Sequence, residues 1–375
     1  MKEELWFHFD EVPPSGTAVS VRARYLLEAL VRRLSNRYAI VVTTTQREAS
    51  DIPGVRMVVV GAKQRDPNRS FVLRLFDEVV VGAHVAIELV RNEKRPRLVV
   101  MSSPGFITAL FVTTYLRLAK IEYGWDVRDL YPDVFSSAGL MSNSSLSYKA
   151  LNSIVRSVYQ NAVLITAATE TLTKGITAKS KETIFNGYPS TISDYSRQKF
   201  DVTTVIFHGN MGSYQDMEGF LALAKSVTQR RPEVRFLAVG SGTKACCVAD
   251  SSFVEYLGQM SHEETLEIVS RCHVGVSPRT DDPISAGAFP VKIWEYIGLH
   301  LPVLSSPLSE AGIFLEKTGL GLQVCDVSSP EAVDKLIHLI DSQKNGFSPL
   351  ETSEFTRENQ AARFADAISS ALSKG

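Results

Sequence analysis

Short apolar runs alternate with amphipathic segments along most of this chain. Segments with a helical period lie at 20–35, 217–231 and 262–272. The apolar runs are rich in Val and Ile, as in parallel strands that are covered on both faces. They occupy residues 39–45, 55–61, 97–103, 162–168, 202–209, 234–240, 274–278 and 302–306. Their alternation with helices predicts βαβ units and the α/β class, with doubly wound parallel sheets.

The length of 375 residues predicts two domains. Residues 185–200 have the weakest periodicity and many Asn, Gly, Pro and Ser residues, so we expect the linker there. The expected domains are 1–190 and 200–350, and an amphipathic C-terminal helix at 353–375 is expected to join the first domain. Open α/β sheets bind ligands beyond the carboxyl ends of their strands, which predicts a site in a cleft between two facing domains.

Charge is unevenly divided along a chain whose formal net charge is only −1. Residues 1–190 contain 24 Lys and Arg against 18 Asp and Glu, whereas residues 191–375 contain 16 against 23. The small net charge argues against a nucleic-acid-binding protein. The basic first half is compatible with an anionic partner, such as a phosphorylated acceptor or a lipid surface, although a scattered surface excess would give the same count.

The cysteines and the apolar segments indicate the cellular compartment of the protein. The four cysteines, Cys246, Cys247, Cys272 and Cys325, show no zinc-binding spacing and are expected to be reduced thiols. The amino terminus carries acidic residues where a signal peptide needs positive charge. The most apolar stretch, 101–120, is interrupted by Pro104, Gly105 and Arg117 and predicts a strand end and a helix. We therefore expect a cytoplasmic protein.

Two charged residues lie in the apolar stretch FPVKIWEYIGLHLPVLSS, at 289–306. Pro290 can begin a helix without losing a hydrogen bond, and Lys292 and Glu295 share the side opposite its expected buried face. Backbone N–H groups at a helix start favour an anion, so a diphosphate could lie there beside Lys292. Glu295 could accept ribose hydroxyls. A solvated Lys/Glu pair on a surface helix would give the same pattern.

Five segments in the same order resemble retaining glycosyltransferases of family 4, in particular bacterial surface-polysaccharide members. SPRTDDPISAGAFPVKIWEYIGLHLPVLSS (277–306) resembles their nucleotide-sugar site, and HGNMGSYQDMEGF (208–220) a strand-to-helix loop of that site. The others are DVRDLYPD (126–133), IFNGYP (184–189) and PPSGTAVSVRARYLLEALVRR (13–33).

The resemblance implies the GT-B fold, with two facing Rossmann-like domains, the acceptor bound by the first and the donor by the second. It implies transfer of a sugar from a nucleotide diphosphate sugar, expected to be UDP-linked, to a hydroxyl of a glycan or lipid-diphosphate-linked acceptor, with retention. No cofactor and no metal are expected. A lipid-linked acceptor would fit peripheral membrane contact through the basic first domain.

The resemblance also assigns donor-side residues. Lys292 and Arg279 would stabilise the leaving diphosphate. Gly287 stands where the family often has a first glutamate, and Asn210 and Gln215 stand where it has an Arg and Lys clamp. Residues expected to bind the donor are Gly209, Asn210, Gly212, Gln215, Ala288, Phe289 and Glu295.

On the acceptor side, Gly16 and Thr17 precede a helix, where their amides could approach a phosphate or sugar, although a plain turn would look the same. Asp126 is expected to be catalytic, either orienting the acceptor hydroxyl or stabilising positive charge at the anomeric carbon. Asp129 is expected to bind the acceptor. An internal Asp/Arg pair with Arg128 is the structural alternative for either carboxylate.

Three other functions remain open. GSGTKA at 240–245 mimics a dinucleotide fingerprint, but too few residues follow it for the crossover helix of an oxidoreductase. A UDP-N-acetylhexosamine epimerase shares the implied architecture. A nucleotide-sugar-binding homologue that lost catalysis is kept open by Gly287. The chain contains no Asp-x-Asp sequence, which disfavours a metal-dependent glycosyltransferase.

Overall fold

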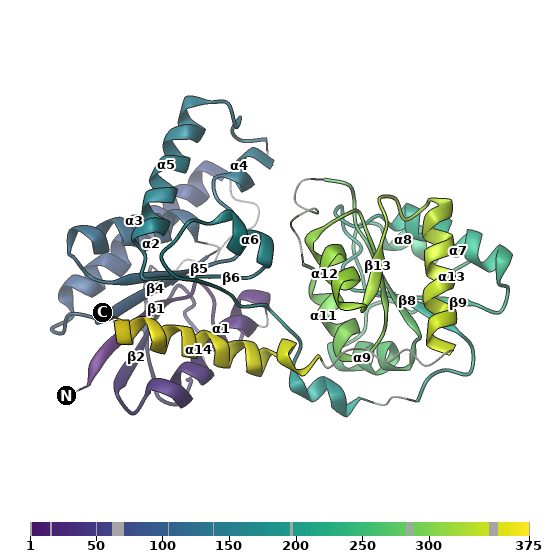
Figure 1. Ribbon diagram of the computed structural model, residues 1–375, viewed down its shortest axis with the longest axis horizontal. Helices are drawn as coiled ribbons and strands as arrows, with labels where there is room; N and C mark the ends of the chain where they lie inside the picture. The colour runs from purple at the N-terminus through teal and green to yellow at the C-terminus, as the bar shows by residue number, and fades with distance from the viewer. Residues whose placement is uncertain are drawn as a thin grey trace. The chain divides into compact units, whose positions relative to one another are not determined.

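The computed structural model describes residues 2–15, 17–49, 51–61, 71–103, 105–137, 139–195, 198–282, 285, 287, 289–344 and 352–374. The chain divides into two compact units. Unit 1 comprises Met1–Asn186 and Arg357–Gly375, and unit 2 comprises Gly187–Thr356. Each unit contains its own parallel sheet with helices on both faces (Figure 1).

Unit 1 contains a seven-stranded sheet in the order β3-β2-β1-β4-β5-β6-β7, counted over the described residues. The strands are β1 Glu3–His8, β2 Tyr38–Thr44, β3 Val55–Val59, β4 Leu98–Ser102, β5 Tyr123–Val127, β6 Leu164–Ala167 and β7 Lys181–Thr183. The helices are α1 Ala18–Leu34, α2 Phe71–Arg91, α3 Phe106–Leu118, α4 Asp133–Ser137, α5 Leu146–Asn161, α6 Glu170–Gly175 and α14 Arg357–Lys374. All the strand pairings are parallel.

The strands of unit 1 are apolar on both faces because helices cover both. Trp6 and Trp125 pack among residues of α2, α3 and α5, whereas Leu5 and Phe7 pack among residues of α1 and α14. The C-terminal helix α14 lies along α1 (Figure 1). This helix is tied to unit 1 by the Arg33–Asp366 ion pair of 2.8 Å. Burial on both faces is the physical reason for the uninterrupted Val and Ile runs.

Unit 2 contains a six-stranded parallel sheet in the order β10-β9-β8-β11-β12-β13 over its described residues. The strands are β8 Thr204–His208, β9 Arg235–Val239, β10 Glu255–Tyr256, β11 Val274–Pro278, β12 Val303–Ser306 and β13 Gly321–Gln323. The helices are η1 Ser190–Asp194, α7 Met217–Arg230, α8 Ala245–Ala249, α9 His262–Arg271, α11 Val291–Gly298, α12 Glu310–Thr318, α13 Pro330–Lys344 and η2 Ser353–Phe355. Helices α7, α8 and α13 cover one face of the sheet, and α9, α11 and α12 lie on the other (Figure 1).

The predicted fold class, two Rossmann-like parallel-sheet domains of the α/β class, is confirmed. The short strands β7, β10 and β13 lie at sheet edges and were not predicted, since two or three residues show no periodicity. Strands β1 and β5 were given no range either, although both lie in the interior of the first sheet. Among the described helices, none is both long and apolar enough to cross a membrane.

Candidate functional site

In unit 2 the strand order reverses between β8 and β11. Such a reversal opens a crevice at the carboxyl ends of the two strands, because their loops leave toward opposite sides. The β8 loop and the β11 loop are joined there by an antiparallel bridge between Gln215 and Arg279. Helix α11 follows the β11 loop and begins after Pro290, which adopts extended backbone as its N-cap. The candidate donor site is built from these two loops and α11.

Lys292, at the start of α11, is buried and reaches back to the end of β8. Its Nζ lies 3.8 Å from the centroid of the Phe207 ring and donates to Gln215 Oε1 at 3.2 Å. Burial lowers the pKa of Lys292 to about 7, and the charge of Arg279 acts in the same direction while Glu295 opposes it. Gln215 is its hydrogen-bond acceptor among the described residues, so two ammonium hydrogens remain for a ligand. An anion bound here would raise the pKa of Lys292 again and so favour its protonated form.

Glu295 lies one turn further along α11 and is 5% exposed. Its Oε2 is 3.5 Å from His208 Nε2, and its Oε1 is 3.5 Å from His262 Nε2. Burial lowers the pKa of His208 to about 3, with further lowering by the charges of Lys292 and His262. His208 is therefore neutral at pH 7, and its contact with Glu295 is not an ion pair. A buried carboxylate beside a neutral imidazole can accept hydroxyl donors.

The expected placement of Lys292 and Glu295 opposite the buried face of the helix needs correction. Residues Lys292–Gly298 are all buried, so α11 has no solvated side along this run. The pair shares a helix face, as the spacing predicted, but this face is covered by the end of β8. A solvated surface pair is thereby excluded.

Arg279 is held by its own loop. Its Nε donates to Ser285 Oγ at 3.1 Å, and that hydroxyl donates to Asp282 Oδ2 at 2.9 Å. The backbone N–H of Arg279 donates to Ser306 O at 2.9 Å. The guanidinium is thus oriented by the β11 loop and lies near enough to Lys292 to lower its pKa. Two neighbouring cations of this kind are suited to binding a diphosphate.

The β8 loop has the backbone geometry that its glycines allow. Gly209 has φ of +110°, and a Cβ on Gly240 would lie 2.0 Å from Gly209 O. The two glycines therefore let the β8 and β9 loops pack backbone to backbone. A Cβ on Gly212 would lie 3.2 Å from Asn210 Oδ1. Asn210 is exposed at the tip of this loop, whereas Gln215 is buried beside Lys292.

The last two expected donor residues precede α11. Phe289 stacks on Trp294, with ring centroids 4.3 Å apart and planes within 8°, and packs edge-on against Phe314. Its ring belongs to an aromatic cluster of unit 2, which anchors the end of the β11 loop. Ala288 lies outside the described residues. Gly287 is exposed, and a Cβ there would meet nothing within 4 Å.

The dinucleotide-like segment at 240–245 has a packing explanation. It leads into α8, which has five residues and is far shorter than the crossover helix of a dinucleotide fold. A Cβ on Gly242 would lie 2.6 Å from the backbone carbon of Met211. The glycines of this segment thus let it pack closely against the β8 loop.

In unit 1, Asp126 lies at the centre of a buried hydrogen-bond network. Arg22 donates to both carboxylate oxygens, from Nη2 at 2.8 Å and from Nε at 3.1 Å. Ser102 and Thr166 donate to the same carboxylate at 3.0 and 2.8 Å. Burial by itself would raise the pKa of Asp126, but the charge and hydrogen bonds of Arg22 and the bond from Thr166 lower it overall. With 0% exposure, the carboxylate is placed to order β4, β5 and β6 rather than to meet an acceptor.

The other acceptor-side residues lie on loops. Thr17 is the N-cap of α1, where its hydroxyl accepts from Ser20 N at 3.2 Å and also contacts Glu11. Gly16 lies outside the described residues. Asp129 is exposed in the loop after β5, where an incoming hydroxyl could reach it.

Several site residues escaped the sequence analysis. His8 ends the strand β1 and Asp10 lies just beyond it, at the reversal of strand order in unit 1, with His8 Nε2 3.4 Å from Asp10 Oδ1. Of the seven histidines, only His208 was expected to face the cleft, so His8 was not selected. His262 is the first residue of α9 and lies within the capping box formed by Ser261 and Glu264. Its sequence context therefore indicates a helix start and not a ligand site.

A known protein family matches part of unit 2 of this chain. Residues 202–342, within unit 2, match the family of glycosyl transferases group 1. No curated protein sequence matches the chain significantly.

Solved structures match the whole chain at low identity. WaaG, a glycosyltransferase involved in lipopolysaccharide biosynthesis, has a TM-score of 0.60 and 13% identity, with 98% of each chain covered. HepE of Anabaena, solved with UDP, has a TM-score of 0.56 and 13% identity over 99% of this chain and 98% of that one. A protein of Listeria monocytogenes assigned as a UDP-N-acetylglucosamine 2-epimerase has a TM-score of 0.58 and 11% identity, over 100% and 98%.

At these identities the likeness to solved structures establishes the fold alone, and the family match is confined to residues 202–342 of unit 2. The match of residues 202–342 to glycosyl transferases group 1, together with the GT-B fold of the whole chain, supports a glycosyltransferase.

Proposed function

We propose that this protein transfers a sugar from a UDP-sugar to a hydroxyl of a glycan or lipid-linked acceptor in surface polysaccharide biosynthesis. Transfer occurs with retention at the anomeric carbon and without a metal ion. The observation that carries the proposal is the buried Lys292, whose Nζ has one acceptor, Gln215, among the described residues and lies at the start of α11 beside the reversal of strand order. The HepE structure contains UDP, which supports a uridine nucleotide as donor.

Each group has a defined part in this proposal. The diphosphate lies against Lys292 and Arg279 at the start of α11, where charge that develops on the leaving group is stabilised. Glu295 accepts hydroxyls of the ribose. Thr17 and Asp129 contribute to binding of the acceptor by unit 1, and Asp126 positions the strand ends that carry their loops. Peripheral membrane contact through the basic first domain brings the enzyme to a lipid-linked acceptor.

Nucleotide binding tests the donor site directly. A thermal-shift screen with UDP, GDP, ADP and their sugars is expected to give stabilisation by UDP and UDP-sugars, because a ligand that binds only the folded state stabilises it. Glu295→Ala should weaken that binding by roughly 10- to 100-fold, since a hydrogen bond to a charged group contributes about 1.5–3 kcal/mol.

A matched control separates this effect from general damage. Glu331→Ala removes an exposed glutamate of α13 and should leave UDP binding unchanged. Stabilisation by none of the nucleotides, or equal affinity of Glu295→Ala and the wild type, would contradict the assigned donor site. Isomerisation of a UDP-sugar without any acceptor would identify an epimerase instead.

The affinity for UDP-sugar should also depend on pH. The pKa of Lys292 is lowered to about 7 in the free protein, and the diphosphate binds the protonated amine. Affinity should therefore be constant below pH 7 and fall by up to about tenfold per pH unit above it. Calorimetric titrations between pH 6 and 8.5 measure this, and Lys292→Met should bind weakly with a flat profile. A flat profile for the wild type would contradict the role of Lys292.

A further inference from the structure

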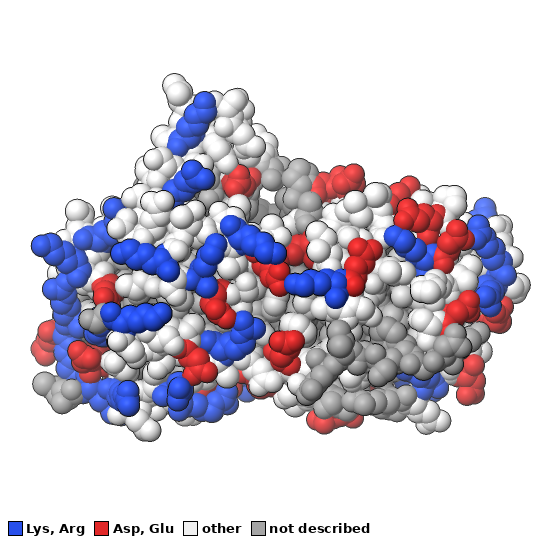
Figure 2. All heavy atoms as spheres, in the orientation of Figure 1, with Lys and Arg blue, Asp and Glu red and all other residues white. Residues whose placement is uncertain are grey.

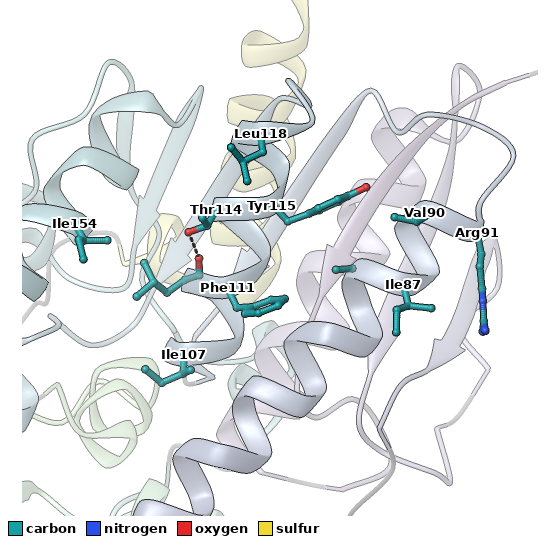
Figure 3. A pocket seen from close by; sticks show the side chains of 11 residues that line it. Ile87, Val90, Arg91, Ile107, Phe111, Thr114, Tyr115, Leu118 and Ile154 are labelled. Carbon is teal, nitrogen blue, oxygen red and sulfur yellow. Dashed lines mark hydrogen bonds between the residues drawn. The ribbon is translucent and has the colours of Figure 1, made fainter.

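Helices α2, α3 and α5 expose apolar side chains to solvent on the outside of unit 1. A groove of about 850 Å³ runs between α2 and α3 and reaches Ile154 of α5. Figure 3 shows Ile87 and Val90 from α2 beside Phe111 and Leu118 from α3. We call these three helix faces with their groove the apolar surface.

The apolar surface extends well past the groove itself. Phe76 of α2 is 62% exposed, Leu118 of α3 is 80% exposed and Leu146 of α5 is 84% exposed. Single exposed apolar side chains are ordinary, but an apolar groove lined by three helices, with further exposed apolar residues on two of them, marks an interaction surface. A bound small molecule would be largely enclosed by its site, which does not fit side chains exposed to this degree. The occupant is therefore broad and apolar.

Charge identifies the occupant further. Helices α3 and α5 contain Arg117, Lys149 and Arg156 and no acidic residue. Figure 2 shows Lys or Arg side chains on the surface over α5. Lys149 and Arg156 also line a polar hollow on that helix.

Acidic residues of α2 are engaged within unit 1. Glu78 accepts a hydrogen bond from Ile107 N at 2.8 Å, and Glu88 pairs with Arg91 at 3.5 Å. Helix α2 contains Arg74 and Arg91 against Asp77, Glu78 and Glu88, so the three helices together hold five basic and three acidic residues, a formal net charge of +2.

Arg117, Lys149 and Arg156 form no ion pair with a carboxylate of the described residues. An apolar surface on helices that carry such basic residues is complementary to a bilayer that contains anionic lipids.

We propose that the apolar surface of α2, α3 and α5 lies in the interface of an anionic lipid bilayer. The apolar side chains enter the boundary between headgroups and acyl chains, while Lys149, Arg156 and Arg117 contact lipid phosphates. This deepens the membrane contact of the proposed function by naming the surface that makes it. It does not depend on the donor site, which lies in unit 2.

Vesicle co-sedimentation of the full chain tests the surface. The wild type should bind phosphatidylglycerol-containing vesicles more tightly than pure phosphatidylcholine vesicles, and less tightly as salt increases. Val90→Ser, Leu118→Ser and Ile154→Ser combined take one exposed residue from each helix and should weaken binding at least about tenfold. A matched triple variant of exposed residues in unit 2, Val202→Ser, Phe253→Ser and Ile313→Ser, should bind as the wild type.

A charge variant gives an independent test if the first triple variant does not fold. Lys149→Gln with Arg156→Gln should weaken binding to anionic vesicles by roughly 10- to 30-fold. Lys225→Gln with Lys374→Gln removes the same charge elsewhere and should not. Stabilisation of each variant by UDP is measured in parallel, so that loss of the membrane contact and loss of the donor site are distinguished.

Three results would overturn the proposal. The first is absence of binding to anionic vesicles at low salt, and the second is equal binding by wild type and both variants. The third is a different occupant: a dimer that the Val90/Leu118/Ile154 variant dissociates in sedimentation velocity, or one-to-one binding of a monomeric lipid without binding to vesicles.

Discussion

Lys292→Ala is expected to reduce the turnover of the UDP-sugar by about 10²- to 10³-fold. The reason is that charge develops on the diphosphate as the sugar leaves, and a preorganised donor in a buried site stabilises that charge far more than water does. Lys292 already lies at this position, buried against Phe207 and hydrogen-bonded to Gln215. The measurement is UDP released from the donor that stabilises the wild type, with kcat and KM determined separately.

The split between kcat and KM shows what the ammonium does. A fall in kcat means that it acts mainly on the transition state, whereas a rise in KM alone means uniform binding of the diphosphate. Lys225→Ala is the matched control, because it removes an exposed lysine from the same unit. A Lys292→Ala enzyme with kcat and KM within threefold of the wild type would refute the assigned role.

Asp126→Ala should destabilise unit 1 by about 3–5 kcal/mol, because it leaves the guanidinium of Arg22 buried without its countercharge. The Arg22–Asp126 pair is 5% and 0% exposed in its side chains, so solvent cannot replace the lost partner. The pKa of Asp126 is lowered in the folded state, so its contribution is present at neutral pH and is lost as pH falls through that lowered value. Urea unfolding at pH 7 is followed by tryptophan fluorescence, which reports on Trp6 and Trp125 of this unit together with Trp294 of unit 2.

A surface pair supplies the comparison. Glu28→Ala breaks the exposed Arg24–Glu28 pair of α1 and should change stability by less than about 0.5 kcal/mol. Asp126→Asn keeps the shape of the side chain and separates the two roles considered for this residue. Full stability with lost turnover in Asp126→Asn would favour the catalytic role over the structural one.

The α/β class could be predicted because alternation of apolar strands and helices is a local property of the chain. The spacing of Lys292 and Glu295 likewise placed both on one side of one helix. The sequence did not predict which side is buried, because that depends on Phe207 and His208, which lie more than 80 residues earlier. The same limit applies to Asp126, whose carboxylate could have been catalytic until Arg22, Ser102 and Thr166 were seen to occupy it.

The apolar surface shows a further limit of the sequence. Phe76, Val80, Ile87 and Val90 recur at intervals that are typical of a core-facing helix. In the structure the four are exposed, because α2 meets the sheet through its other apolar residues, such as Val85 and Leu89. Periodicity identifies an apolar face but does not identify what covers it.

Sequence alone determined the alternation of elements and the α/β class, and it singled out Lys292 and Arg279 as candidates for holding a diphosphate, since these inferences follow from local spacing and side-chain chemistry. The tertiary structure decided that the pKa of Lys292 is lowered, that both carboxylate oxygens of Asp126 accept hydrogen bonds within unit 1, and that the α2–α3 groove is exposed. Each of these depends on strand order, which brings together side chains that are distant along the chain and excludes water from some of them but not from others.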